Sequence, residues 1–213
     1  MRAKRAAEIQ LERARSAAIL AGGAGIRMGA PKPGVDLDGR PLISYAVDAA
    51  RAAGLEPLVV AKSSPDLPDV GCGVLIEPDE TIHPLAGIVT ALSHAGAPIV
   101  VLPCDAPLVP PELLVALASR AAPFAMPTHP RAQPLVARYA PALLPRLRVA
   151  LAAEEPMVSL ANDLGGDRLG AAELTAFGDP DWMFANANDP AELERLATEL
   201  RRRRRPSQGP LEG

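Results

Sequence analysis

Uninterrupted apolar runs alternate with amphipathic segments along the first half of this 213-residue chain. The first run, 16–21, leads into a glycine-rich loop, and an amphipathic stretch over 41–53 then stops at Gly54, as a helix does at a glycine cap. Further apolar runs and helical segments follow in the same alternation, at 57–61, 73–76, 85–95, 98–102 and 111–122. Strands that are apolar on both faces are typical of a parallel sheet covered by helices on each side. The pattern therefore predicts an α/β fold with a doubly wound, mostly parallel sheet in three layers.

The second half of the chain predicts shorter elements in a mixed arrangement. We expect short strands at 124–126 and 134–139 and a helix over 142–153. A final helix is expected over 190–204, because Asp189 is a suitable N-cap and a proline occupies the first helical position.

The organisation predicted from these elements is a single domain over 16–200, because neither an internal repeat nor a long linker divides it. It is preceded by a charged helical extension, 1–15, and followed by a basic tail, 201–213, that we expect to be disordered. Both ends are basic while the body carries an excess of acidic side chains, which disfavours a nucleic-acid surface. Aromatic residues make up only 3%, too few for a platform on which single strands stack.

The sequence contains no recognisable targeting segment and no cysteine pattern of a metal site or a disulfide scaffold. No apolar run approaches the roughly 18 residues of a membrane span, and the N-terminus has no apolar stretch of signal-peptide length. Cys72 and Cys104 lie far apart and form no Cys-x-x-Cys pair, which argues against a zinc site or a disulfide scaffold. We therefore expect a cytoplasmic protein with no membrane and no nucleic-acid partner.

The segment from Leu20 to Lys32 has the composition of an anion-binding loop. It leaves the first predicted strand and carries four glycines together with Arg27 and Lys32. Glycines let backbone N–H groups approach phosphate oxygens closely, and the two cations neutralise charge. The carboxyl end of a first strand is also where α/β sheets place ligands. A turn without a ligand explains the glycines but not both cations.

Two better-known glycine loops are excluded. The dinucleotide fingerprint fits Gly23 and Gly25 but meets Met28 where its third glycine belongs. The P-loop requires Ser or Thr after its lysine, whereas Lys32 is followed by Pro33.

Asp105 closes the apolar run that begins at Pro98, so its carboxylate is expected at the same sheet edge as the glycine-rich loop. Magnesium prefers one or two carboxylates together with nucleotide phosphate oxygens. Asp105 is thus predicted to be a metal ligand, the alternative being a cap for the turn toward Pro107.

Several blocks in sequence resemble nucleotidyltransferases, most closely the molybdenum cofactor guanylyltransferases, over roughly residues 16–197. The blocks are Leu20-Ala-Gly-Gly23, Gly25-Ile-Arg27-Met28-Gly29, Lys32, Leu37-Asp-Gly-Arg-Pro-Leu42, Pro84-Leu-Ala-Gly87, Leu102-Pro-Cys-Asp105 and Phe184-Ala-Asn-Ala-Asn188. The resemblance implies a Rossmann-like nucleotidyltransferase fold. It also implies Mg²⁺-dependent transfer of GMP from GTP to molybdopterin with release of pyrophosphate. Molybdoenzymes or their accessory proteins are the implied partners.

The resemblance assigns residues to three overlapping roles. It implies Arg27, Lys32 and Asp105 as catalytic residues and Asp105 as the metal ligand. The implied nucleotide-binding residues are Leu20, Ala21, Gly22, Gly23, Lys32, Asp79 and Asp105. The implied acceptor-binding residues are Asn186 and Asn188, whose local pattern also predicts a turn and helix cap.

The resemblance leaves alternatives at several positions. Glu77 and Glu80 are neighbours that could take the role of Asp79. Ala61 stands where relatives often have Asn, so Lys62 is a candidate replacement for that nucleotide contact. An arginine that relatives carry near 155–160 is missing, and Arg131 and Arg138 are the nearest substitutes in sequence.

Two other functions remain open from the sequence. One is a cytidylyltransferase, or another nucleotidyltransferase with a different acceptor, because the loop recognises phosphates rather than the base. The other is a non-catalytic nucleotide-binding accessory protein of the same cofactor pathway.

Overall fold

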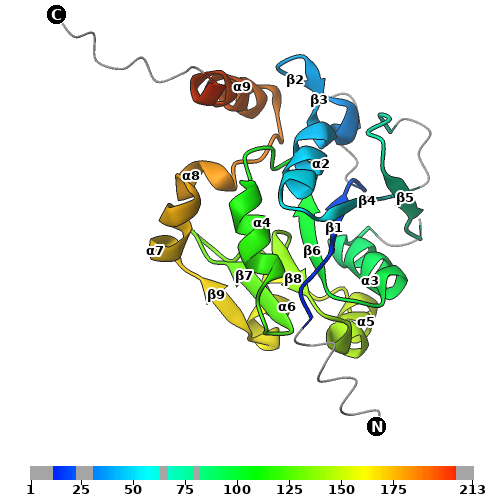
Figure 1. The fold of residues 1–213 in the computed structure, drawn as a ribbon. Coiled ribbons are helices and arrows are strands. Elements are labelled where there is room, and N and C mark those ends of the chain that lie inside the picture. The colour runs from blue at the N-terminus through cyan, green and yellow to red at the C-terminus, as the bar shows by residue number, and fades with distance from the viewer. Residues whose placement is uncertain (1–11, 23–30, 63–66, 79–81, 205–213) are drawn as a thin grey trace, which may run out of the picture.

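The described part of the chain comprises residues 12–22, 31–62, 67–78 and 82–204 in a computed structural model (Figure 1). Three of the predicted site residues, Gly23, Arg27 and Asp79, lie outside these ranges.

A seven-stranded sheet in the order β5-β4-β1-β6-β8-β7-β9 forms the centre of the molecule. Its strands are β1 (Ser16–Leu20), β4 (Glu56–Ala61), β5 (Gly73–Ile76), β6 (Ile99–Pro103), β7 (Phe124–Pro127), β8 (Ala137–Tyr139) and β9 (Asp167–Leu169). The strands β5, β4, β1 and β6 are parallel, and β8 is antiparallel to both of its neighbours. The predicted doubly wound, mostly parallel sheet is confirmed.

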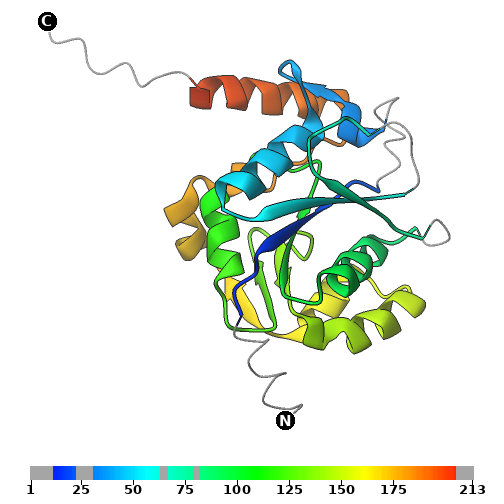
Figure 2. The same cartoon turned by 45° about the vertical axis from the view of Figure 1, so that its right-hand side comes forward.

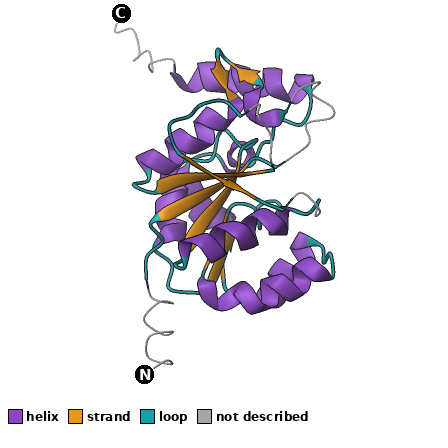
Figure 3. Cartoon of the chain, turned by 90° about the vertical axis from the view of Figure 1, so that its right-hand side faces the viewer, coloured by secondary structure: helices purple, strands orange, loops and turns teal. Residues whose placement is uncertain are grey.

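Helices cover both faces of this sheet, as the turned view in Figure 3 shows. The helices α2 (Leu42–Ala52) and α4 (Pro111–Ala118) pack in one apolar core with Ala17 and Ile19 of β1. The helices α3 (Pro84–Ala95), α5 (Leu144–Ala152) and α6 (Met157–Leu164) pack in the other core with Ala18. Alternate residues of β1 therefore enter opposite cores, which explains why the run is apolar throughout.

The C-terminal helix α9 (Pro190–Arg204) crosses one end of the molecule beside the hairpin β2 (Asp36–Leu37) and β3 (Arg40–Pro41), as Figure 2 shows. It packs on the hairpin and α2 through Leu196, Ala197 and Leu200. Arg201 and Arg204 form ion pairs with Asp38 at 2.8 and 2.6 Å. The domain boundary predicted at residue 200 therefore falls inside α9. The ion pairs with Asp38 hold Arg201 and Arg204, which the sequence prediction assigns to the tail, against the domain.

Of the predicted helical extension, residues 1–15, the structure describes only 12–15. They are not helical. Ala14 is buried, and its N–H donates to the carbonyl of Ala118 at 2.9 Å, while the guanidinium of Arg138 donates to the carbonyl of Glu12 at 2.8 Å. Bonds to the body of the domain thus replace helical bonds in this segment.

Other element boundaries differ from the sequence prediction. The expected strand over 134–139 is reduced to β8, because a turn in which Val136 N–H donates to Gln133 precedes it. The short elements β9, α7 (Ala171–Leu174) and α8 (Pro180–Met183) had no counterpart in the sequence prediction. Among the described residues, no helix has both the length and the apolar character needed to cross a bilayer.

Candidate functional site

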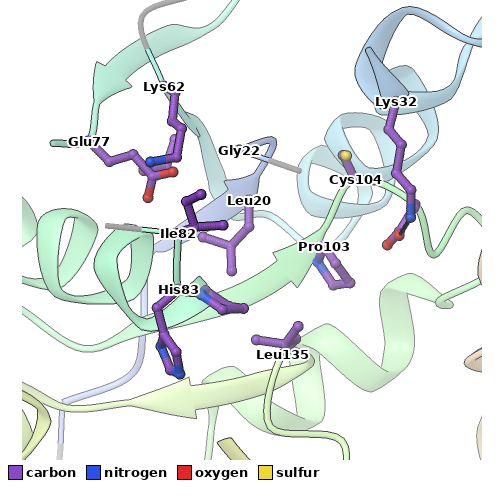
Figure 4. A pocket seen from close by; sticks show the side chains of 13 residues that line it. Leu20, Gly22, Lys32, Lys62, Glu77, Ile82, His83, Pro103, Cys104 and Leu135 are labelled. Atoms are coloured by element: carbon purple, nitrogen blue, oxygen red, sulfur yellow. Dashed lines mark hydrogen bonds and ion pairs between the residues drawn. The ribbon is translucent and has the colours of Figure 1, made fainter. Parts of the chain in front are cut away.

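A cavity of about 330 Å³ opens at the carboxyl edge of the parallel strands. Its walls come from the residues that follow β1, β4, β5 and β6 and from the start of α3. Figure 4 shows Lys62 and Glu77 at one end of it and Lys32 at the other, with Leu20 and Pro103 between them. The predicted location of the ligand site, beyond the end of the first strand, therefore coincides with a cavity.

Lys32 and Asp105 meet at one end of this cavity, as the sequence predicted. The Lys32 ammonium donates to Asp105 Oδ2 at 2.6 Å and to Asn188 Oδ1 at 2.8 Å. The side chains of Lys32 and Asp105 are each 18% exposed, so water screens their ion pair only in part. Three segments that are remote in sequence thus converge on one ammonium group.

The backbone at the end of β6 holds this cluster together. The N–H of Cys104 donates to the carbonyl of Leu20 at 3.1 Å, which extends the pairing of β6 with β1 beyond the strand. The N–H of Ala187, a fully buried residue, donates to the carbonyl of Asp105 at 3.0 Å. This bond fixes the segment that carries both asparagines against the strand that carries Asp105.

Asn186 and Asn188 lie at the start of α9, and only Asn188 contacts Lys32. Asp189 Oδ1 accepts from the N–H of Glu192 at 2.8 Å, and Glu192 Oε2 accepts from the N–H of Asn188 at 2.9 Å. Reciprocal bonds of this kind satisfy N–H groups at a helix N-terminus that have no intrahelical partner. The predicted cap at Asp189 is therefore confirmed, whereas residues 186–188 form no regular turn.

A second cavity, of about 260 Å³, adjoins the cluster through Asn188. It is lined by the side chains of Arg131, Trp182, Phe184, Asn186, Asn188 and Arg195, among others. The Arg195 guanidinium lies 5.7 Å from the centre of the Trp182 ring, within the range of a cation–π contact. Aromatic faces next to cations and amides suit a flat, polar and anionic ligand.

The buried acid of the first cavity is Glu77. Glu77 is 6% exposed. A Cβ added at Gly22 would lie 2.2 Å from Oε1 of Glu77. A Cβ at Gly87 would lie 3.0 Å from its Oε2, so glycines on two elements make room for this carboxylate. Lys62 also lines this end of the cavity and donates to the carbonyl of Pro78 at 3.4 Å.

The other sequence-based candidates have different positions. Leu20 and Gly22 line the cavity, whereas Ala21 points into the apolar core and its N–H pairs with Val60. Of the two substitute arginines, Arg131 lines the second cavity. Arg138 is completely buried and donates to the carbonyls of Ala118, Ala122 and Glu12, so it has a structural role.

One cavity residue, His83, had no predicted role at the site. Its Nδ1 accepts from the N–H of Leu85 at 3.2 Å and so caps α3, while its side chain lines the cavity. Its position directly before the Pro84-Leu-Ala-Gly87 block is the sequence signal that could have identified it.

The donor set at Asp105 limits how a metal ion can bind. Within the described ranges, no group of three or more His, Cys, Asp or Glu side chains could hold a metal ion. A single carboxylate at a strand end suits Mg²⁺ when phosphate oxygens and water supply the other ligands. Burial, the largest cause, raises the pKa of the adjacent Cys104 thiol to about 12, so this sulfur stays protonated and is a poor ligand.

Comparisons with known proteins identify the family of the chain. Residues 17–169 match the family model described as the MobA-like NTP transferase domain. A protein of Shewanella sp. strain MR-4 named molybdenum cofactor guanylyltransferase is 33% identical over 193 residues, which cover 86% of this chain and 95% of that protein. A protein of the same name from Shewanella piezotolerans strain WP3 is 31% identical, over 85% of this chain and 91% of its own.

A solved structure shares the fold. Molybdopterin-guanine dinucleotide biosynthesis protein A from Archaeoglobus fulgidus superposes with a TM-score of 0.76 at 24% identity, over 88% of this chain and 99% of that chain. The family model spans more than half of the sequence, and the Shewanella relatives match most of both chains. The chain therefore belongs to the MobA-like NTP transferase family and is a nucleotidyltransferase.

Proposed function

We propose that the protein transfers GMP from GTP to the terminal phosphate of molybdopterin carrying its molybdenum, with Mg²⁺, and releases pyrophosphate. The observation that carries the proposal is the convergence of Lys32, Asp105 and Asn188 at the strand edge, next to both cavities. The names of the Shewanella relatives support the same substrates.

The transfer forms one bond and breaks one. An oxygen of the acceptor phosphate attacks the α-phosphorus of GTP, and the bond from that phosphorus to the bridging oxygen breaks, so that pyrophosphate leaves with the electron pair. A phosphate oxygen is already anionic at neutral pH, so no activated Ser, Cys or His is required. The protein accelerates the reaction by positioning the two substrates and by neutralising charge.

Lys32, Arg27 and Asp105 are the residues that we assign to charge neutralisation. The Lys32 ammonium balances charge on the α-phosphate and the leaving pyrophosphate, and we assign the same role to Arg27. Asp105 would hold the Mg²⁺, which when bound adds positive charge beside the donor phosphates.

The choice of GTP rests on Glu77. Guanine presents two adjacent N–H donors, N1 and N2, on one edge, and a carboxylate can accept both. Cytosine and adenine present one amino donor beside an acceptor nitrogen, which a carboxylate repels. We therefore assign the nucleobase-recognising acid to Glu77, in place of Asp79, and we assign Leu20 and Gly22 to the same nucleotide subsite.

The acceptor is assigned to the second cavity. A pterin is a flat heterocycle with several hydrogen-bonding groups, and its phosphate is an anion. Trp182 and Phe184 offer aromatic faces, and Arg131 and Arg195 offer cations near Asn186. Arg131 thereby takes the place of the arginine that relatives carry near 155–160.

We further propose a cytoplasmic location, where triphosphates are available and where Cys72 and Cys104, both free thiols, stay reduced. Molybdoenzymes or their accessory proteins would receive the product.

Pyrophosphate release with Mg²⁺ and molybdopterin, measured in parallel with GTP, CTP, ATP and UTP, tests the proposal. Release with GTP alone is the expected result. Release of pyrophosphate with CTP alone would show that the donor is CTP and not GTP. Binding of GTP without release would indicate an accessory protein or another acceptor. Binding at about 100-fold the dissociation constant adds about 2.7 kcal/mol of stability, so a thermal shift detects it without turnover.

A further inference from the structure

The Lys32 ammonium is bonded to one oxygen of the carboxylate that would hold a metal ion, Asp105 Oδ2. It donates to Asp105 Oδ2 at 2.6 Å and to the Asn188 side-chain oxygen at 2.8 Å. The oxygen that accepts this hydrogen bond belongs to a carboxylate in Asp105 and to a neutral amide in Asn188. Lys32 is therefore shared between a charged and an uncharged partner from different segments of the chain.

A divalent ion and this ammonium compete for one carboxylate. Mg²⁺ binds carboxylate oxygens at about 2.0–2.1 Å, so an ion on Asp105 would lie only a few ångströms from an ammonium on the same group. Repulsion between like charges at that range is strong where solvent is partly excluded, as it is here with both side chains 18% exposed. A triphosphate changes the balance, because its oxygens accept from the ammonium and also ligate the ion.

We propose that Lys32 keeps divalent ions off Asp105 until a nucleoside triphosphate arrives, and that Asn188 then holds the displaced ammonium in line with the phosphates. This inference rests on the proposed function for its nucleotide half. Lys32 is a catalytic residue in this scheme, and Asn188 is a positioning residue that acts through it. Asp105 would then hold a metal ion only after a triphosphate has drawn Lys32 away.

Asn188 is well placed for this role. Its amide oxygen accepts a hydrogen bond from the ammonium without cancelling the charge that the phosphates require. Its backbone N–H is bonded to Glu192, and the preceding residue, Ala187, is bonded to the carbonyl of Asp105. The anchor and the carboxylate are thus fixed to each other, so Lys32 could leave Asp105 while keeping its bond to Asn188.

The first test measures Mn²⁺ binding to the full-length, nucleotide-free protein by titration with electron paramagnetic resonance of free Mn²⁺. Lys32→Met should bind Mn²⁺ at least about tenfold more tightly than the wild type, and Lys32→Met combined with Asp105→Asn should lose the gain. Arg148→Met removes an exposed cation on α5, which lines neither cavity, and should change binding by less than about twofold. Equal affinities of the wild type, Lys32→Met and a second variant, Lys32→Gln, would overturn the proposal.

The second test measures Mg²⁺–GTP binding by calorimetry without any acceptor. Asn188→Ala should weaken binding by about tenfold, which corresponds to about 1.4 kcal/mol, whereas Asn162→Ala, at an exposed asparagine of α6, should have no effect. Unchanged binding in Asn188→Ala would overturn the positioning role and leave Asn188 as an acceptor contact. If the wild type binds no GTP, the proposed function fails, while the Mn²⁺ test still decides whether Lys32 guards Asp105.

Discussion

Replacing Glu77 by glutamine tests the nucleobase subsite most directly. Gln has nearly the volume of Glu, so the contacts with Gly22 and Gly87 are kept while the negative charge and one acceptor oxygen are lost. Glu77 is 6% exposed, so water cannot replace the lost acceptor. A hydrogen bond to a charged group contributes about 1.5–3 kcal/mol, and kcat/KM with GTP should therefore fall by about 10- to 100-fold.

The comparison of GTP with ITP makes this prediction specific. Hypoxanthine lacks the N2 amino group, so the wild type should prefer GTP to ITP by about tenfold, and Glu77→Gln should lose most of that preference. Pyrophosphate release at varied nucleotide concentrations gives both values. Glu56→Gln, an exposed glutamate at the start of β4, is the matched control and should behave as the wild type.

A substitution that leaves Glu77 in place supplies an independent check. In Gly22→Ala the new Cβ would lie 2.2 Å from Glu77 Oε1, so the carboxylate must rotate away. The same loss of GTP preference is expected, with little change in melting temperature because a flexible side chain absorbs the shift. A Glu77→Gln variant that retains both kcat/KM with GTP and the ratio of GTP to ITP would refute the assignment of this residue.

Three further predictions concern catalysis and stability. Lys32→Ala should lower kcat by about 10²–10³-fold with an unchanged melting curve, and near-normal turnover would exclude Lys32 from catalysis. Arg138→Met leaves buried carbonyls without their donor and should destabilise the fold by about 2–4 kcal/mol, seen as a lower midpoint in urea. The pKa of Glu199 is lowered to about 2, chiefly by a hydrogen bond from Arg202, so its contribution to stability is present above the ordinary pKa of 4.5 and is lost as pH falls toward 2. The difference in melting temperature between the wild type and Glu199→Gln should consequently narrow between pH 6 and about pH 3, and a constant difference would contradict this linkage.

Local patterns in the sequence were sufficient for the parallel half of the sheet. The apolar runs at β1, β4, β5 and β6 and the capping signals at α9 act over a few residues, so they can be read without the fold. The region around β8 and β9 was harder to predict. Its strands have three residues each, and their pairing depends on neighbours far along the chain.

The end of the cavity that we propose for phosphate binding could also be predicted from the sequence. Lys32 stands in a glycine- and proline-rich loop after the first strand, and Asp105 closes another parallel strand, so topology alone brings them to one edge. The acidic residue at the other end was different, because Glu77, Asp79 and Glu80 are adjacent and equally plausible by composition. The structure describes only Glu77 of the three, and its carboxylate lies between Gly22 and Gly87, which is why we propose it for this role.

The sequence by itself determined the fold class, the family and the sheet edge at which Lys32 and Asp105 meet, because each depends on short-range patterns or on strand ends that must meet. The tertiary structure decided which partner each charge has. Asn188 reaches Lys32 across 156 residues, and Arg138 is buried against backbone carbonyls rather than facing a ligand. Such contacts depend on how distant segments pack, and burial is what makes each one matter, because a charge removed from water must find its partner within the protein.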